Sequence, residues 1–125
     1  MAENTLTVVA TEAGPDETVR VVAVRGDVDM DSAPELERVL VEAARVPGRV
    51  TVVDLSGTGF ADSTMLHVLL TAQRGHRAAG RRMVLAGPFG ETVTRLLDVT
   101  GTAGFFEIVA GLDAVLGELP GARGD

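Results

Sequence analysis

Residues 50–64 of this 125-residue chain read VTVVDLSGTGFADST, and the expected architecture follows from them. Val50 to Leu55 is a nearly continuous apolar run, which is typical of a strand covered on both faces. Residues 56–61 predict a loop, because two glycines separate this strand from the start of a helix. The tripeptide Asp62-Ser63-Thr64 offers residue types preferred as helix caps. The stretch therefore predicts a buried strand, a loop and a helix.

The sequence before this stretch predicts two strands and a helix. Strands are expected at residues 5–10 and 19–24, and the turn signal within residues 11–17 makes them a hairpin. Residues 26–29 are expected to break the second strand. Asp31 or Ser32 can then cap a helix that Pro47-Gly48 ends. One face of that helix is apolar and consists of Ala33, Leu36, Val39, Leu40 and Ala43.

The sequence after the stretch continues the alternation of helices and strands. The helix that opens at Asp62 has a broad apolar surface and is expected to be largely buried. The elements expected next are a strand at 83–86, a helix stopped by Gly101, a strand at 105–109, a helix at 112–119 and a tail at 120–125. The order ββαβαβαβα predicts one α/β domain over residues 1–125, with its core at about 6–119. Its sheet is expected to be mainly parallel, with an N-terminal hairpin.

Composition excludes several classes of function. The formal net charge is −7, so the chain is not expected to bind nucleic acid, whose phosphates would repel it. All 11 basic residues are arginines, which excludes P-loop and Schiff-base lysines, and the absence of cysteine excludes thiolate chemistry. No apolar run approaches the roughly 20 residues that cross a bilayer. Met1 to Thr7 does not resemble a signal peptide, so we expect a cytoplasmic protein that does not insert into membranes.

Three loops are expected to meet beyond the carboxyl ends of the parallel strands, where function gathers in such sheets. They are residues 26–31, 56–64 and 87–91. The glycines of 57–62 resemble a dinucleotide fingerprint, but Asp62 stands where that motif needs a small residue, so a flexible turn before a cap is favoured. Asp54 ends the central strand as a receiver aspartate would. Without the acidic pair and lysine of receivers, it is expected to accept hydrogen bonds from loop amides.

Catalytic alternatives have little support in the sequence. Ser63 or Thr64 could approach His67 on one helical face, but a hydroxyl nucleophile also needs an orienting group and an oxyanion site. His76 has no metal-ligand spacing. We therefore expect no enzyme activity, no catalytic residue, no metal and no cofactor. A basic cluster, consisting of Arg74, Arg77, Arg81 and Arg82, is expected to complement a helix C-terminus, with a docking role as the alternative.

Two interpretations of Asp62-Ser63-Thr64 remain open on its chemistry. As a cap, one oxygen of the tripeptide accepts the unpaired amides of the first helical turn. Capping needs only one of the three side chains, which leaves a hydroxyl free at an exposed helix start. A phosphate there would add about −1.5 to −2 charges beside Asp62 and would act mainly on partner binding. The tripeptide is thus either a plain cap or a cap that carries a phosphorylation switch.

Four segments in this order resemble the STAS domain of bacterial anti-sigma factor antagonists, and the similarity covers roughly Leu6 to Leu119. They are residues 26–29 (GDVD), 53–56 (VDLS), 60–64 (FADST) and 93–101 (VTRLLDVTG). The resemblance implies a regulatory protein that binds an anti-sigma factor, often a serine/threonine kinase, and so controls transcription. It implies phosphorylation of Thr64, with Ser63 as second choice, and reversal by a phosphatase. Asp29, Asp62, Ser63 and Thr64 are the implied partner-binding residues.

Two positions depart from the family pattern. Thr64 stands where serine is more frequent, and Met65 follows where glycine is usual, so the bulky Met65 is expected to obstruct a kinase or to select a different one. STAS domains also serve as structural parts of transporter complexes. The alternative function is therefore a constitutive interaction subunit of a transporter or scaffold complex that is not phosphorylated.

Overall fold

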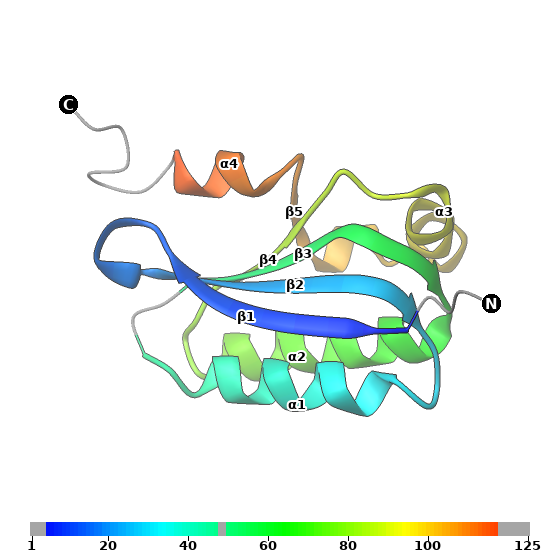
Figure 1. Ribbon diagram of the computed structural model, residues 1–125, viewed down its shortest axis with the longest axis horizontal. Coiled ribbons are helices and arrows are strands. Elements are labelled where there is room, and N and C mark those ends of the chain that lie inside the picture. Colours follow the sequence, from blue (N-terminus) through cyan, green and yellow to red (C-terminus); the bar gives the residue numbers. More distant parts are fainter. Residues whose placement is uncertain (1–4, 48–49, 118–125) are drawn as a thin grey trace.

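The computed structural model describes residues 5–47 and 50–117 and contains a five-stranded sheet with the strand order β1-β2-β3-β4-β5 (Figure 1). The strands are β1 (Thr7–Ala13), β2 (Val19–Val28), β3 (Val50–Ala61), β4 (Met83–Ala86) and β5 (Glu107–Val109). The helices are α1 (Ala33–Ala44), α2 (Ser63–Ala78), α3 (Glu91–Thr100) and α4 (Leu112–Leu116), with short 3-10 turns at Pro15–Glu17 and Ala103–Phe105. β1 is antiparallel to β2 and every other pairing is parallel. The predicted α/β class, hairpin and element order are confirmed.

The sheet is covered on both faces. α1 and α2 lie side by side on one face, α4 lies on the other, and α3 sits at one end (Figure 1). Along β3, Val53 and Leu55 belong to the larger apolar cluster beneath α1 and α2, whereas Val52 belongs to the smaller cluster that contains Val115 of α4. All four side chains are fully buried. This two-sided burial explains why residues 50–55 are continuously apolar.

Two of the predicted loops are strand instead. β2 does not break at residues 26–29 but runs to Val28, and residues 56–61 continue β3 to Ala61. The two strands stay paired through register shifts, and the buried Thr58 hydroxyl donates to the Val24 carbonyl at 3.0 Å. A Cβ at Gly57 would lie 2.9 Å from the Arg25 side chain, and one at Gly59 would lie 2.9 Å from Asp27 Oδ1. The glycines permit close strand contact here, so expecting a loop from them was wrong.

Other boundaries move for local reasons. β1 extends to Ala13 instead of ending at Ala10, because Glu12 opposes Arg20 in the hairpin and forms a 2.9 Å ion pair with it. β5 begins at Glu107, two residues late, because Phe105 closes a 3-10 turn by donating its amide to the Thr102 carbonyl. The predicted helix end at Leu119 and the tail at 120–125 lie outside the described residues. Within residues 5–47 and 50–117, no helix combines the length and the apolar character that a membrane span needs.

His76 is a buried polar residue of α2 that ties this helix to β3. Its Nδ1 lies 2.8 Å from the Ala72 carbonyl oxygen and its Nε2 lies 3.0 Å from the Thr51 hydroxyl. A neutral ring that donates through Nδ1 and accepts through Nε2 satisfies both contacts. Burial lowers the pKa of His76 below its ordinary value of 6.5, and the positive charge of Arg81 lowers this pKa further.

Acid should therefore destabilise the fold through His76. Below pH 6.5 the His76 imidazole is protonated in the unfolded chain but stays neutral in the folded chain. The free energy of unfolding therefore falls as the pH drops toward the lowered pKa of the folded state. The slope for one proton is at most about 1.4 kcal/mol per pH unit. Urea denaturation between pH 7.5 and 5 should show this decline in the wild type and a flatter profile in His76→Gln. Parallel profiles for the two proteins would contradict a role of His76.

Candidate functional site at the start of α2

The carboxyl ends of β2 and β3 meet the starts of α1 and α2 at one corner of the molecule. Val28 and Ala61 are register partners, and the Phe60 amide donates to Asp27 Oδ1 at 2.8 Å. The segment before α3 reaches the same edge, since a Cβ built on Gly90 would lie 3.6 Å from the Thr58 carbonyl oxygen. The three predicted segments therefore converge as expected, although much of the first two is strand.

Asp29 organises the connection between β2 and α1. Its Oδ1 accepts hydrogen bonds from the amides of Asp31 and Ser32, each at 3.0 Å, and lies 3.0 Å from the Ser32 hydroxyl. The bonds from the Ser32 amide and hydroxyl hold the pKa of Asp29 below its usual value. Ser32 occupies the cap position of α1, which is one of the two predicted positions, but its side chain makes no cap bond to the helix. The Asp29 carboxylate instead holds the connection that precedes the helix, through the Asp31 and Ser32 amides.

Asp62 caps α2. Its backbone is extended and its Oδ1 accepts the Thr64 amide at 2.8 Å. Ser63 is exposed and Thr64 is half-buried, and neither hydroxyl has a hydrogen-bond partner in the described part of the chain. The tripeptide thus assigns capping to its aspartate and leaves both hydroxyls chemically free. The Thr64 oxygen is not one of the buried unpaired atoms, so it keeps contact with solvent.

Met65 does not obstruct this surface. Its side chain is fully buried in the core beneath α1 and α2, so it points away from the hydroxyls that precede it. The expectation that Met65 obstructs access to Thr64 or selects the kinase is therefore not supported by its position. A buried methionine at the third position of the first helical turn anchors the helix start instead.

The four predicted site residues share this corner with two exposed apolar side chains. Met30 follows Asp29 and is 74% exposed, and Phe60 at the end of β3 is 49% exposed. We call the set of Asp29, Met30, Phe60, Asp62, Ser63 and Thr64 the corner surface. Sequence reasoning missed Met30 and Phe60 as site residues. The available signal was a large apolar side chain within two residues of a predicted site residue, since Met30 follows Asp29 and Phe60 comes two residues before Asp62.

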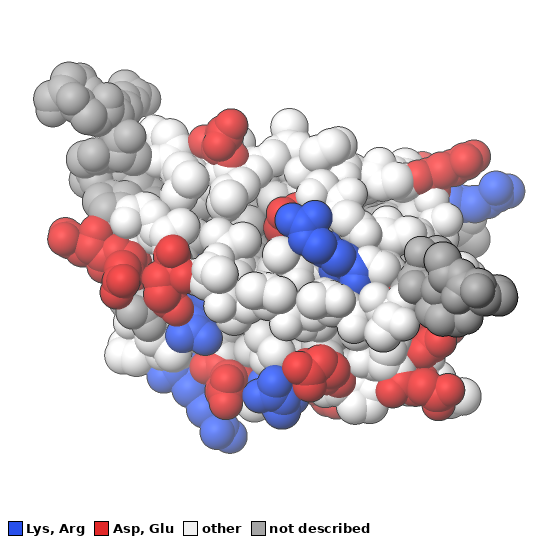
Figure 2. Space-filling view, in the orientation of Figure 1, with Lys and Arg blue, Asp and Glu red and all other residues white. Residues whose placement is uncertain are grey.

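The corner surface is acidic at its border. Figure 2 shows acidic side chains gathered at the lower right, over the connection between β2 and α1. Asp29 and Asp31, which belong to that connection, are both exposed. A partner that binds here must accommodate negative charge next to apolar area, and exposed Met30 supplies such area within the same connection.

The alternatives raised by the sequence find no support in this geometry. Residues 57–61 are strand, so the glycine motif is neither a flexible turn nor a phosphate cradle at a helix start. Asp54 Oδ1 accepts the Ser56 amide at 3.0 Å, as expected of a structural acceptor. His67 is exposed and has no hydrogen bond to Ser63 or Thr64. Over the described residues, no group of three or more His, Asp or Glu side chains could hold a metal ion.

A family model described as "Mlab, STAS domain" matches residues 11–114. The chain belongs to the STAS domain family. Curated protein sequences gave no match to it. The expected family is thus confirmed over most of the described residues, and the fold has the strand and helix order of STAS domains.

Solved structures share this STAS fold over most of the chain. An anti-sigma factor antagonist from Mycobacterium paratuberculosis is 25% identical, with a TM-score of 0.81, and the match covers 94% of this chain and 96% of that one. The phosphorylated form of the Bacillus cell fate determinant SpoIIAA is 14% identical, with a TM-score of 0.62 and coverages of 89% and 96%. The murine anion transporter Slc26a9 is 15% identical, with a TM-score of 0.65; the match covers 86% of this STAS chain but 18% of the transporter.

The cap assignment gives a direct test of this geometry. Asp62→Ala removes the oxygen that accepts the Thr64 amide, so it should lower the free energy of unfolding by about 0.5–2 kcal/mol. Ser63→Ala, its matched neighbour, should change it by no more than about 0.5 kcal/mol. Chemical denaturation of both variants at pH 7 measures the difference. Equal destabilisation by the two substitutions would contradict the assignment of Asp62 as the cap.

Proposed function

We propose that this STAS domain is an anti-sigma factor antagonist that binds an anti-sigma factor through the corner surface and is switched off by phosphorylation of Thr64. The observation that supports this proposal is that different side chains cap α2 and offer free hydroxyls at its start. Asp62 caps the helix, and the hydroxyls of Ser63 and Thr64 remain without a hydrogen bond in the described residues. The similarity to the mycobacterial antagonist, which extends over nearly the whole of both chains, supports the choice of partner class.

The local electrostatics favour a switch that acts on binding and spares the fold. A phosphate on Thr64 would meet the positive end of the α2 dipole, which stabilises negative charge. It would also stand beside the Asp62 carboxylate at the exposed border of the molecule. A partner shaped for a neutral hydroxyl at that point would face a dianion in a partly desolvated contact. Such a mismatch typically costs about 2–5 kcal/mol of binding free energy.

The modifying enzyme would be the partner itself or a protein bound to it. Among the anti-sigma factor antagonists that the sequence resembles, the anti-sigma factor is often a serine/threonine kinase, and a phosphatase removes the phosphate that it adds. The exposed Ser63 is the second choice as acceptor, because its hydroxyl is equally free but it precedes the position that matches the family acceptor. The buried position of Met65 leaves Thr64 approachable from solvent. A cytoplasmic location follows from such a partner and is part of the proposal.

A second candidate is a constitutive interaction subunit of a transporter complex. The observation that favours it is the shared fold with an anion transporter, of which an STAS-like part makes up a minor share. That subunit would use the same fold without phosphorylation. The two functions therefore differ in the partner recovered and in whether Thr64 accepts phosphate.

Substitution of Thr64 should separate binding from folding. The partner is first recovered with the unmodified protein from its own cytosol, and its affinity is then measured by titration. Thr64→Glu should weaken binding by about thirtyfold or more, whereas Thr64→Ala should keep it within about threefold. Thr71→Glu, at an exposed threonine later in α2, is the matched control and should leave binding unchanged. Wild-type affinity for Thr64→Glu would refute the switch.

Intact mass after incubation with the recovered partner and ATP completes this test. A phosphate added to the wild type but not to Thr64→Ala supports the antagonist. Recovery of a membrane transporter, with no added mass, supports the constitutive subunit. Phosphate on Thr64→Ala but not on Ser63→Ala would move the acceptor to Ser63.

The apolar part of the corner surface can be tested without disturbing the loop. Asp29 is a poor probe, because its carboxylate accepts two loop amides and its replacement alters the connection itself. Met30→Ser changes an exposed side chain and should weaken partner binding by roughly tenfold, as for a central apolar contact. Val99→Ser is the matched control, since Val99 is 77% exposed but lies on α3. Equal affinities of the two variants would place the interface elsewhere.

A further inference from the structure

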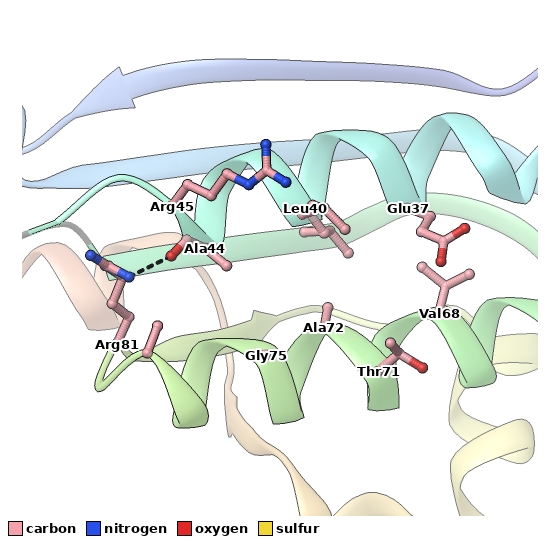
Figure 3. A pocket seen from close by; sticks show the side chains of 11 residues that line it. Glu37, Leu40, Ala44, Arg45, Val68, Thr71, Ala72, Gly75 and Arg81 are labelled. Carbon is pink, nitrogen blue, oxygen red and sulfur yellow. Dashed lines mark hydrogen bonds between the residues drawn. The ribbon is translucent and has the colours of Figure 1, made fainter.

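A cavity of about 460 Å³ opens between α1 and α2 and extends from the second turn of each helix to the residues that follow it (Figure 3). Its lining runs along α1 from Glu37 to Arg45, and along α2 from Val68 to the residues that follow this helix. Its volume lies within the range of small-molecule sites. The proposed interface with an anti-sigma factor does not use it.

The walls of this cavity are apolar. Leu40, Val68 and Ala72 are buried beside it, and Val41 at its rim is 44% exposed. Gly75 of α2 faces open space, since a Cβ built there would meet nothing within 4 Å. A glycine inside a helix is unfavourable relative to alanine, so the missing side chain costs stability while it leaves the hollow open. Such a surface suits an unbranched hydrocarbon chain.

The two ends of the cavity carry opposite charge. Arg81 lies at one end, where its Nη1 donates to the Ala44 carbonyl at 2.6 Å, and the exposed Arg45 side chain starts at the same end and extends back along α1 (Figure 3). Neither arginine forms a salt bridge with a carboxylate of residues 5–47 or 50–117, whereas the neighbouring Arg82 pairs with Glu107. Glu37 lies at the other end. An elongated ligand would therefore bind with its anionic group toward the arginines.

The dipoles of α1 and α2 do not cancel the preference for an anionic group beside the arginines. α1 and α2 both end near the arginines, and each C-terminus carries the equivalent of roughly half a negative charge. Two full positive charges exceed this sum by about one charge. Arg45 and Arg81, of which only Arg81 belongs to the basic cluster predicted to complement a helix C-terminus, thus offset the charge of the helix ends and still leave a net positive charge there. The guanidinium of Arg81, held at Ala44, is already oriented at the mouth of the cavity.

We propose that the groove between α1 and α2 binds a medium-chain amphiphile with a carboxylate head, such as a fatty acid of about ten carbons. The distance along α1 from Glu37 to Arg45 is about 12 Å, which an extended chain of roughly this length spans. The chain lies over Leu40, Ala72 and Gly75, and the carboxylate is bound by Arg81 and by the exposed Arg45 side chain, which turns toward it. This site is independent of the corner surface.

Titration with sodium decanoate below its micelle concentration tests the site. Calorimetry and amide NMR shifts should show saturable binding of one decanoate per chain, with the shifts centred on Leu40, Ala72 and Gly75. Decyltrimethylammonium has the same chain with a cationic head and should bind about tenfold more weakly. The formal charge of −7 favours this cation by itself, so a preference for decanoate has to come from the arginines. Equal or tighter binding of the cation overturns the proposal.

Three variants locate the bound molecule. Gly75→Leu fills the hollow and should abolish decanoate binding. Arg45→Gln changes an exposed side chain, so the fold is retained, and should weaken binding by about tenfold. Arg77→Gln, at an exposed arginine of α2 outside the cavity, should leave the affinity unchanged. No saturable binding by the wild type, or equal effects of Arg45→Gln and Arg77→Gln, overturns the site. These titrations contain no partner protein. A negative result therefore rules out the decanoate site and leaves the proposed binding of an anti-sigma factor untouched.

Discussion

Burial of β3 on both faces is the constraint on which the rest of the structure depends. Val52 faces the cluster beneath α4, while Val53 and Leu55 face the cluster beneath α1 and α2, so helices are required on both sides of the sheet. β3 is also paired with a parallel neighbour on each edge. Parallel pairing requires crossover connections, and the crossover helices α1 and α2 cover one face, whereas α4, which follows the last strand, covers the other. The end of this strand at Ala61 determines where α2 begins.

At the start of α2, the side chains that hold the backbone in place are different from those whose charge can change. Asp27, Asp29 and Asp62 each accept hydrogen bonds from backbone amides, and those bonds hold the end of β3 against β2, the connection between β2 and α1, and the start of α2. The hydroxyls of Ser63 and Thr64 take no part in this bonding. Charge can therefore change at Thr64 while the groups that position it stay intact. This separation is what a reversible binding switch requires of a small domain.

The two ends of the α1–α2 layer have different chemistry. At the corner surface, Met30 and Phe60 are exposed, the segments that carry them also carry Asp29 and Asp62, and Met65 is buried in the core. At the opposite end, small residues such as Ala72 and Gly75 line an open groove beside two arginines. The same pair of helices thus carries the proposed partner-binding surface at its starts and an apolar cavity between its members. The buried bond between His76 and Thr51 ties the second half of α2 to the sheet.

The sequence by itself determined the element order, the hairpin, the mainly parallel sheet and a helix cap within residues 62–64, whereas the structure assigned that cap to Asp62. Apolar periodicity, turn residues and cap oxygens act within a few neighbouring residues. Only the tertiary structure decided that residues 56–61 are strand, that Asp29 holds a loop and that Met65 is buried. Those features depend on β2 lying against β3 and on α1 and α2 packing over the sheet. The exposure of Met30 and the groove at Gly75 have the same origin, because surfaces and hollows exist only after distant segments have come together.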